Sequence, residues 1–72
     1  MGRPLNSIDQ MVGKALRTLR VDRSLTVDQL AEALRIEPPL LLSMEAGAER
    51  VPAQLLMRAS IRFDVPISIF YE

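Results

Sequence analysis

Basic side chains at regular spacing are the residues of this sequence best suited to a chemical task. Lys14, Arg17, Arg20 and Arg23 follow one another at steps of three, which forms a partial stripe along one side of a helix. Such a stripe can bind phosphate groups or an acidic partner. The simpler interpretation is a solvated helix face whose charges are compensated by neighbouring carboxylates, and the spacing alone leaves both interpretations open.

The residue types that catalysis and metal binding need are largely missing. The 72 residues include no histidine and no cysteine, so the commonest general base, the commonest zinc ligands and any disulfide are excluded. No glycine-rich phosphate loop is present, and Ser24, Ser43 and Ser60 have no adjacent base that could activate them. We therefore expect no enzymatic activity, no cofactor, no metal and no small-molecule substrate.

The balance of charges limits the partners that the chain can bind. Nine basic and nine acidic residues give a net charge of zero. Binders of duplex DNA usually carry a basic excess, so DNA binding is expected to be weak or non-specific unless the cations gather on one side. No apolar run approaches the roughly 20 residues that cross a bilayer, and the first residues lack the apolar stretch of a signal peptide. A cytoplasmic protein without membrane contact is expected.

Helical periodicity runs through the chain, and strand-like alternation is missing. One domain is expected over residues 1–72, with 1–6 as a flexible N-terminal segment. Thr26 and Gln29 form a capping-box pattern that begins the second helix, and Pro38 suits the first position of the third. Five short helices are expected, at about residues 7–20, 26–35, 38–46, 52–63 and 66–72.

Apolar residues mark the face of each expected helix that should be buried. The stripe of the first helix begins at Ile8 and that of the second at Val27, and Phe63 lies on the core side of the fourth. Ile69 and Phe70 are expected to close the core from the C-terminal turn. The second and third helices are separated by only three or four residues, which is helix-turn-helix spacing.

Three stretches carry a resemblance to a known family: "LTVDQLAEAL", "MEAG" and "FDVPISIFYE". With them, residues 12–72 resemble the Cro/phage-repressor type of helix-turn-helix domain, often called the XRE family, and look most like a subgroup common among alphaproteobacterial regulators. The resemblance implies an all-α, compact five-helix bundle of the lambda-repressor-like type. It also implies transcription regulation as a dimer, with the third helix in the DNA major groove, and a structural pair between Arg20 and Glu45.

The expected recognition helix departs from the pattern of that family. Side chains that donate and accept hydrogen bonds read the edges of bases, and the family usually places them at five positions of this helix. Four of the five residues here cannot hydrogen-bond through the side chain, so base-specific reading by the usual mode is expected to be weak or absent. The five positions are Pro38, Pro39, Leu40, Leu42 and Ser43. The candidates for phosphate contacts are Arg17, Arg35 and Arg50.

An apolar recognition face permits two interpretations. An exposed apolar patch on a small domain usually marks a protein contact, whereas scattered surface leucines are common and need no function. We favour a transcription-control protein whose third-helix face contacts a protein partner or a second copy of itself. The alternatives are a conventional sequence-specific DNA-binding regulator that acts as a dimer, and a pure dimerisation module. The candidates for the protein contact are Val27, Pro38, Pro39, Leu40, Leu42 and Ser43.

A homodimer is expected, and the sequence leaves its interface open between the third helix and the C-terminal end. Leu55 and Ile61 lie outside the expected core side of the fourth helix, and the C-terminal turn carries further apolar residues. The candidates for the dimer contact are Leu55, Ile61, Ile67, Phe70 and Tyr71.

Overall fold

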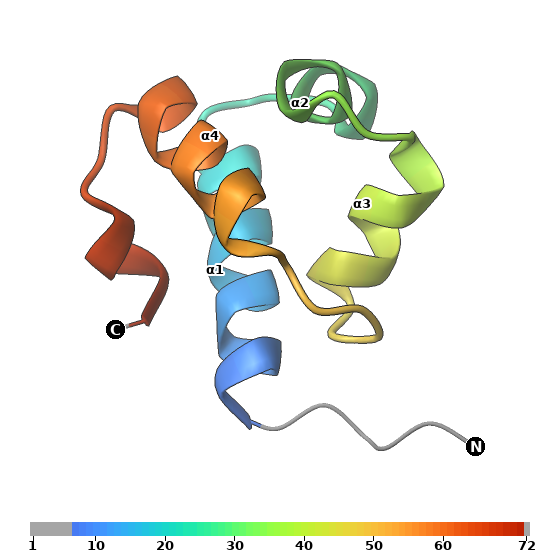
Figure 1. Ribbon diagram of the computed structural model, residues 1–72. Coiled ribbons are helices and arrows are strands. Elements are labelled where there is room, and N and C mark those ends of the chain that lie inside the picture. Colours follow the sequence, from blue (N-terminus) through green and yellow to red (C-terminus); the bar gives the residue numbers. More distant parts are fainter. Residues whose placement is uncertain (1–6, 72) are drawn as a thin grey trace.

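Four α-helices and a C-terminal 3-10 helix make up residues 7–71, the part of the chain that the computed structural model describes (Figure 1). No strand occurs among those residues, so the all-α class is confirmed. The count of five α-helices is not confirmed, because the last segment is a short 3-10 helix, a geometry suited to brief segments. The expectation for residues 1–6 lies outside the described part. The bounds are α1 Ser7–Asp22, α2 Val27–Leu34, α3 Pro38–Glu45, α4 Ala53–Phe63 and η1 Ile67–Tyr71.

Local hydrogen bonds begin α2 as the sequence predicts. The Oγ1 atom of Thr26 accepts a hydrogen bond from the backbone N–H of Gln29 at 3.0 Å, and Gln29 Oε1 accepts one from the N–H of Thr26 at 2.9 Å. This reciprocal pair confirms the capping box. The helix ends at Leu34 and is followed by Arg35, whose backbone is left-handed with φ of 60°. A residue with a side chain adopts that conformation at a cost of about 1 kcal/mol.

Proline and glycine set the two ends of α3. Pro38 occupies the first helical position, where its missing N–H would have no helical partner. Gly47 follows the helix with φ of 80°, so the expected left-handed glycine is confirmed. Its N–H donates to the carbonyl oxygen of Met44 at 3.1 Å, which closes the turn.

The helices pack around a core to which every element contributes. In Figure 1, α1 runs through the middle of the molecule, with α3 on one side and η1 on the other. Helix α2 packs against α3 and α4, and α4 also packs against η1. Burying a large apolar side chain stabilises the fold by about 1.5–3 kcal/mol. The largest fully buried side chains are Phe63, Phe70, Leu16, Leu30, Leu34, Leu41 and Leu56.

Two expectations about burial are wrong. Ile8 is 53% exposed, because it lies in the first turn of α1, at the end that extends past the other elements (Figure 1). Leu55, expected outside the core, is only 7% exposed. The buried stripe of α4 is wider than expected, because Leu55 and Ala59 are four residues apart and share one face.

A glycine allows α1 and α3 to cross closely. Gly13 is buried in the middle of α1, and a Cβ atom built on it would collide with the carbonyl oxygen of Met44 in α3. The sequence analysis did not single out this residue. The available signal was its place inside a helical pattern, where a glycine is unfavourable unless packing requires it.

Candidate functional site

Helix α3 presents an outer face that the rest of the fold leaves uncovered. Three residues, 35–37, connect it to α2, and its inner face is buried through Leu41, Met44 and Glu45. Successive residues of an α-helix are about 100° apart. The outer arc of α3 therefore runs, in order around the helix, through Leu42, Ala46, Pro39, Ser43 and Leu40.

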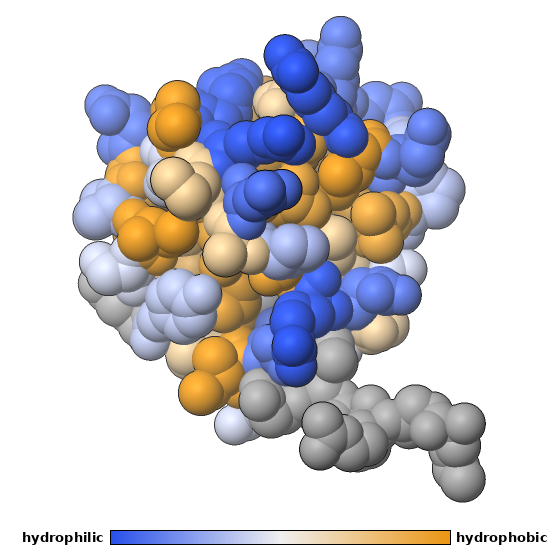
Figure 2. Space-filling model, viewed as in Figure 1, coloured by the Kyte–Doolittle hydropathy of each residue, from blue (hydrophilic) through white to orange (hydrophobic). Residues whose placement is uncertain are grey.

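The outer face of α3 is apolar with a single hydroxyl group. Leu42 is 52% exposed and Leu40 is 37% exposed, while the hydroxyl-bearing Ser43 is half-buried. No charged residue occurs between Pro38 and Met44. In the space-filling view, hydrophobic atoms lie over the region where Figure 1 places α3, with hydrophilic atoms beside them (Figure 2). This face can exclude water and contact apolar groups, but it offers few hydrogen bonds.

Two of the proposed contact residues contribute less to this face than the others. Val27 is half-buried and packs against the core, so it belongs mainly to the packing beneath α2. Pro38 is also half-buried, at the first position of α3. The exposed apolar side chains of the outer face are consequently those of Pro39, Leu40, Leu42 and Ala46.

An ion pair between α1 and α3 fixes the position of this face. Arg20 Nε donates to Glu45 Oε2 at 2.8 Å, and Arg20 Nη2 donates to Glu45 Oε1 at 3.1 Å. The side chains are 13% and 3% exposed. Arg20 Nη1 donates a third hydrogen bond to the carbonyl oxygen of Leu25 at 3.0 Å, so Arg20 also binds the segment that precedes α2. The hydrogen bonds that Arg20 donates to the Glu45 carboxylate raise the pKa of Arg20, which favours its charged form.

A second arginine of the basic stripe also holds the fold together. Arg23 Nη1 donates to the carbonyl oxygen of Phe63 at 2.9 Å, at the C-terminal end of α4, and its guanidinium lies 5.7 Å from the centre of the Phe63 ring. This contact is a cation–π interaction combined with a helix-end hydrogen bond. Arg20 and Arg23 therefore serve the fold, while Lys14 and Arg17 remain as exposed cations of the stripe.

Arg17 lies beside the outer face of α3. It lines one surface depression together with Arg20 and Glu45, and the same depression is bordered by Leu42 and Ala46 of the outer face. Arg17 is exposed, and the structure shows no ion pair for it among the described residues. A cation of α1 thus adjoins the apolar strip of α3, which is suitable for a ligand that combines phosphate with apolar groups.

The other two candidates for phosphate contacts lie elsewhere. The Nε atom of Arg50 is 3.4 Å from Asp9 Oδ1, so its charge is partly neutralised although 68% of its side chain is exposed. Arg35 lines a different depression, between α2 and α4, together with Arg58 and Arg62. Arg58 Nη1 also donates to the carbonyl oxygen of Leu34 at 3.0 Å, which satisfies the end of α2. The structure does not bring Arg17, Arg35 and Arg50 together.

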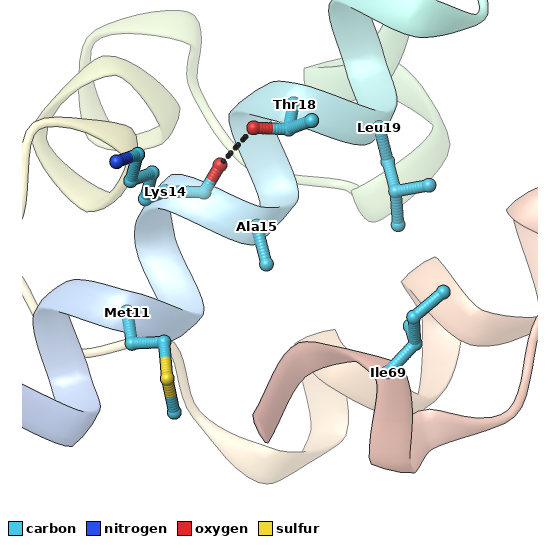
Figure 3. Close-up of a pocket in the computed structure, with 6 residues that line it drawn as sticks. All are labelled: Met11, Lys14, Ala15, Thr18, Leu19 and Ile69. Carbon is cyan, nitrogen blue, oxygen red and sulfur yellow. Dashed lines mark hydrogen bonds between the residues drawn. The ribbon is translucent and has the colours of Figure 1, made fainter. Parts of the chain in front are cut away.

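A groove between α1 and η1 offers no set of catalytic groups. In Figure 3 the side chains of Met11, Leu19 and Ile69 point into the gap between the two elements. The hydroxyl of Thr18 donates to the carbonyl oxygen of Lys14 at 2.9 Å, so this polar group is already used within the helix. Within residues 7–71 no group of three or more side chains is placed to hold a metal ion. Over the same range no helix is long and apolar enough to cross a membrane.

The dimer candidates divide into exposed and buried residues. Ile61 is 79% exposed, Tyr71 is 51% exposed and Ile67 is 40% exposed, so all three can contact a second chain. Leu55 and Phe70 are buried in the core of this chain. The interpretation of these two as dimer contacts is wrong, because their apolar surface is already used in folding.

Comparison with known families and proteins gives one consistent result. Residues 15–62 match the helix-turn-helix domain family. The chain is 34% identical over 67 residues to uncharacterized HTH-type transcriptional regulators of Sinorhizobium medicae and Rhizobium meliloti. Each match covers 93% of this chain and 48% of the relative. The chain therefore spans about half the length of the curated relatives it matches.

Solved structures extend the similarity to three dimensions. A crystal structure of the clp gene regulator ClgR from Corynebacterium glutamicum superposes with a TM-score of 0.83 at 30% identity, covering 93% of this chain and 71% of that one. A second crystal structure of ClgR gives a TM-score of 0.80 at 31% identity, covering 94% of this chain and 86% of that one. The arrangement of α1 to η1 is thus similar to that of a gene regulator.

Proposed function

Since the chain belongs to the helix-turn-helix domain family, we propose that it is a DNA-binding transcription regulator of XRE type that places the outer face of α3 in the major groove. The relatives are named as transcriptional regulators, which supports regulation of transcription and gives no support to catalysis. The observation that carries the proposal is the exposed outer face of α3, the second helix of the α2–α3 pair, which the ion pair of Arg20 and Glu45 links to α1.

Phosphate contacts come from cations that border this face. Arg17 adjoins Leu42 and is exposed, so it can bind a phosphate at the edge of the groove while α3 lies inside. Arg50 is a second candidate for a phosphate contact, away from this face, and its charge is shared with Asp9. Because few cations take part and the net charge is zero, the affinity should depend on salt less steeply than that of a strongly basic binder.

The alternative, in which the α3 face contacts a protein, has less support. Leu40 and Leu42 are exposed, but they lie on opposite flanks of one eight-residue helix. A standard protein interface takes about 800 Å² from each partner, more than a single short strip supplies. The major groove is about 12 Å wide and accepts one α-helix. The relatives are named as HTH-type transcriptional regulators, and a helix-turn-helix domain places its second helix in the major groove.

We further propose that two copies act together through surface at the α4 and η1 end. Ile61, Ile67 and Tyr71 are exposed there and can supply an apolar contact. Dimers of this kind read two half-sites that are about 34–36 Å apart. A bound duplex should then contain a repeated or inverted short sequence at that spacing.

Fluorescence anisotropy with a pool of fragmented genomic duplexes tests the proposal. The titration is made with the wild-type chain at about 50 mM and about 150 mM salt, the range over which phosphate contacts weaken. Two matched variants, Leu42→Glu on α3 and Met57→Glu on α4, add the same charge at sites with similar exposure, 52% and 57%. Micromolar or tighter binding that persists at the higher salt, and that only Leu42→Glu abolishes, is expected. Absence of binding at both salts would contradict the proposal and favour a protein partner.

A further inference from the structure

We propose that α3 selects its DNA through the 5-methyl groups of pyrimidines, chiefly those of thymine. This inference rests on the proposed function, since it assumes that the outer face of α3 enters the major groove. It identifies the chemistry that the face recognises and so predicts which base pairs a bound sequence contains.

The first step is what the outer face cannot read. A side chain that recognises guanine or adenine in the major groove makes paired hydrogen bonds to two atoms of the base edge, as Arg, Lys, Asn and Gln do. None of these residues occurs between Pro38 and Gly47. The one outward polar side chain, Ser43, is half-buried and carries a single hydroxyl that bonds to several bases without discriminating strongly among them.

The second step is what an apolar strip can read. The thymine methyl is the apolar feature that an unmodified base pair presents in the major groove. Leu42 is 52% exposed and Leu40 37% exposed, so both have apolar surface to bury against such a group. Pro39 lies between them on the outer arc and has no side-chain donor that would have to be desolvated.

The third step is the place of the two leucines. They are two residues apart and therefore point to opposite flanks of the helix. Each then meets a different base pair when α3 lies in the groove. Leu42 is on the flank of α3 that lies beside Arg17 of α1, so the thymine contact of Leu42 and a phosphate contact of Arg17 would lie next to each other. Leu40 is on the other flank of α3. A bound half-site should therefore contain at least two contacted thymines, one for each leucine. A variant of one leucine should lose the contact to its own thymine and keep the contact to the other.

The test begins with selection of duplexes from a random library by the wild-type chain. Thymines of the selected sequence are then replaced one at a time by deoxyuridine, which lacks only the methyl group, so the protein is unchanged and no folding defect can confuse the result. Each contacted methyl should account for about a fourfold change in Kd, the factor that about 0.8 kcal/mol of methyl burial produces. A duplex that has cytosine in place of a contacted thymine should bind more weakly. Replacing that cytosine by 5-methylcytosine, which restores the methyl group, should tighten binding by a similar factor.

A cycle of protein and DNA changes assigns each methyl to a side chain. In Leu42→Ala the deoxyuridine effect should disappear at one thymine and remain at the other, and Leu40→Ala should give the reverse. Met57→Ala, an exposed change on α4, serves as the matched control and should leave both effects intact. Helix content measured by circular dichroism confirms that each variant is folded.

The outcomes separate this inference from the proposed function. If duplexes are selected but deoxyuridine changes Kd less than 1.5-fold, or about 0.25 kcal/mol, at every thymine, methyl reading is refuted while DNA binding stands. If no duplex is enriched at all, the proposed function itself fails and the inference fails with it. Selected sequences in which guanine contacts dominate would also overturn the inference.

Discussion

Removal of Arg20 should destabilise the protein more than any change of another charged residue in α1. In Arg20→Met the carboxylate of Glu45, whose side chain is 3% exposed, loses both hydrogen bonds that Arg20 donates to it, at 2.8 and 3.1 Å. Breaking one side of a buried pair costs about 3–5 kcal/mol. Because the Arg20 side chain is 13% exposed, water can partly replace it as the hydrogen-bond donor to Glu45 in the variant. The lower value, a loss of about 3 kcal/mol, is therefore expected. A 72-residue domain has a free energy of unfolding of roughly 4–11 kcal/mol, so much of the stability should be lost.

Urea denaturation followed by circular dichroism measures this loss. Arg17→Met on the same helix is the matched control, because Arg17 is exposed, and its change should stay within about 0.5 kcal/mol. The double variant Arg20→Met with Glu45→Met should recover part of the loss, because it leaves no unpaired buried charge. A loss below about 1 kcal/mol for Arg20→Met would show that the pair behaves like an exposed salt bridge, which would refute the positioning of α3 by this contact.

Three further predictions follow from the packing and the charges. Gly13→Ala should lower the free energy of unfolding by about 1–3 kcal/mol, because its Cβ collides with the carbonyl oxygen of Met44; a stabilised variant in the same urea assay would exclude the close crossing. Phe70→Ala should lower the free energy of unfolding by about 3–5 kcal/mol. Tyr71→Ser, at a residue that is 51% exposed, should lower it by about 1 kcal/mol or less. The same Tyr71→Ser variant should weaken self-association, which sedimentation experiments measure. Arg17→Gln should reduce the salt dependence of DNA binding by about one phosphate contact; an unchanged slope would remove Arg17 from the interface.

Local signals in the sequence predicted the helices well. Thr26 and Gln29 produce their capping box through atoms within four residues, and Pro38 and Gly47 act through their own backbone conformations. Such interactions depend on neighbours along the chain, so a sequence pattern contains them. The ion pair of Arg20 and Glu45 links positions 25 residues apart and came from the family resemblance rather than from spacing.

Features that depend on packing between distant segments could not be predicted in the same way. Whether Leu55 is buried depends on how α4 is rotated toward the rest of the core, and periodicity gives that angle only approximately. The internal use of Arg23 requires the carbonyl oxygen of Phe63, 40 residues away. The close crossing at Gly13 similarly depends on the backbone of α3. The apolar outer face of α3 was visible in the sequence, but its preferred partner was not.

The central claim, that the outer face of α3 contacts DNA, can be tested with a cleaving reagent attached to one residue. Because the sequence has no cysteine, Ser43→Cys provides a single attachment point for an iron chelate on α3, and Ser68→Cys provides the control on η1. On the selected duplex, the chelate at position 43 should cut a few nucleotides within each half-site, and the chelate at position 68 should not cut there. Equal cutting from both positions, or cutting from position 68 alone, would contradict the account.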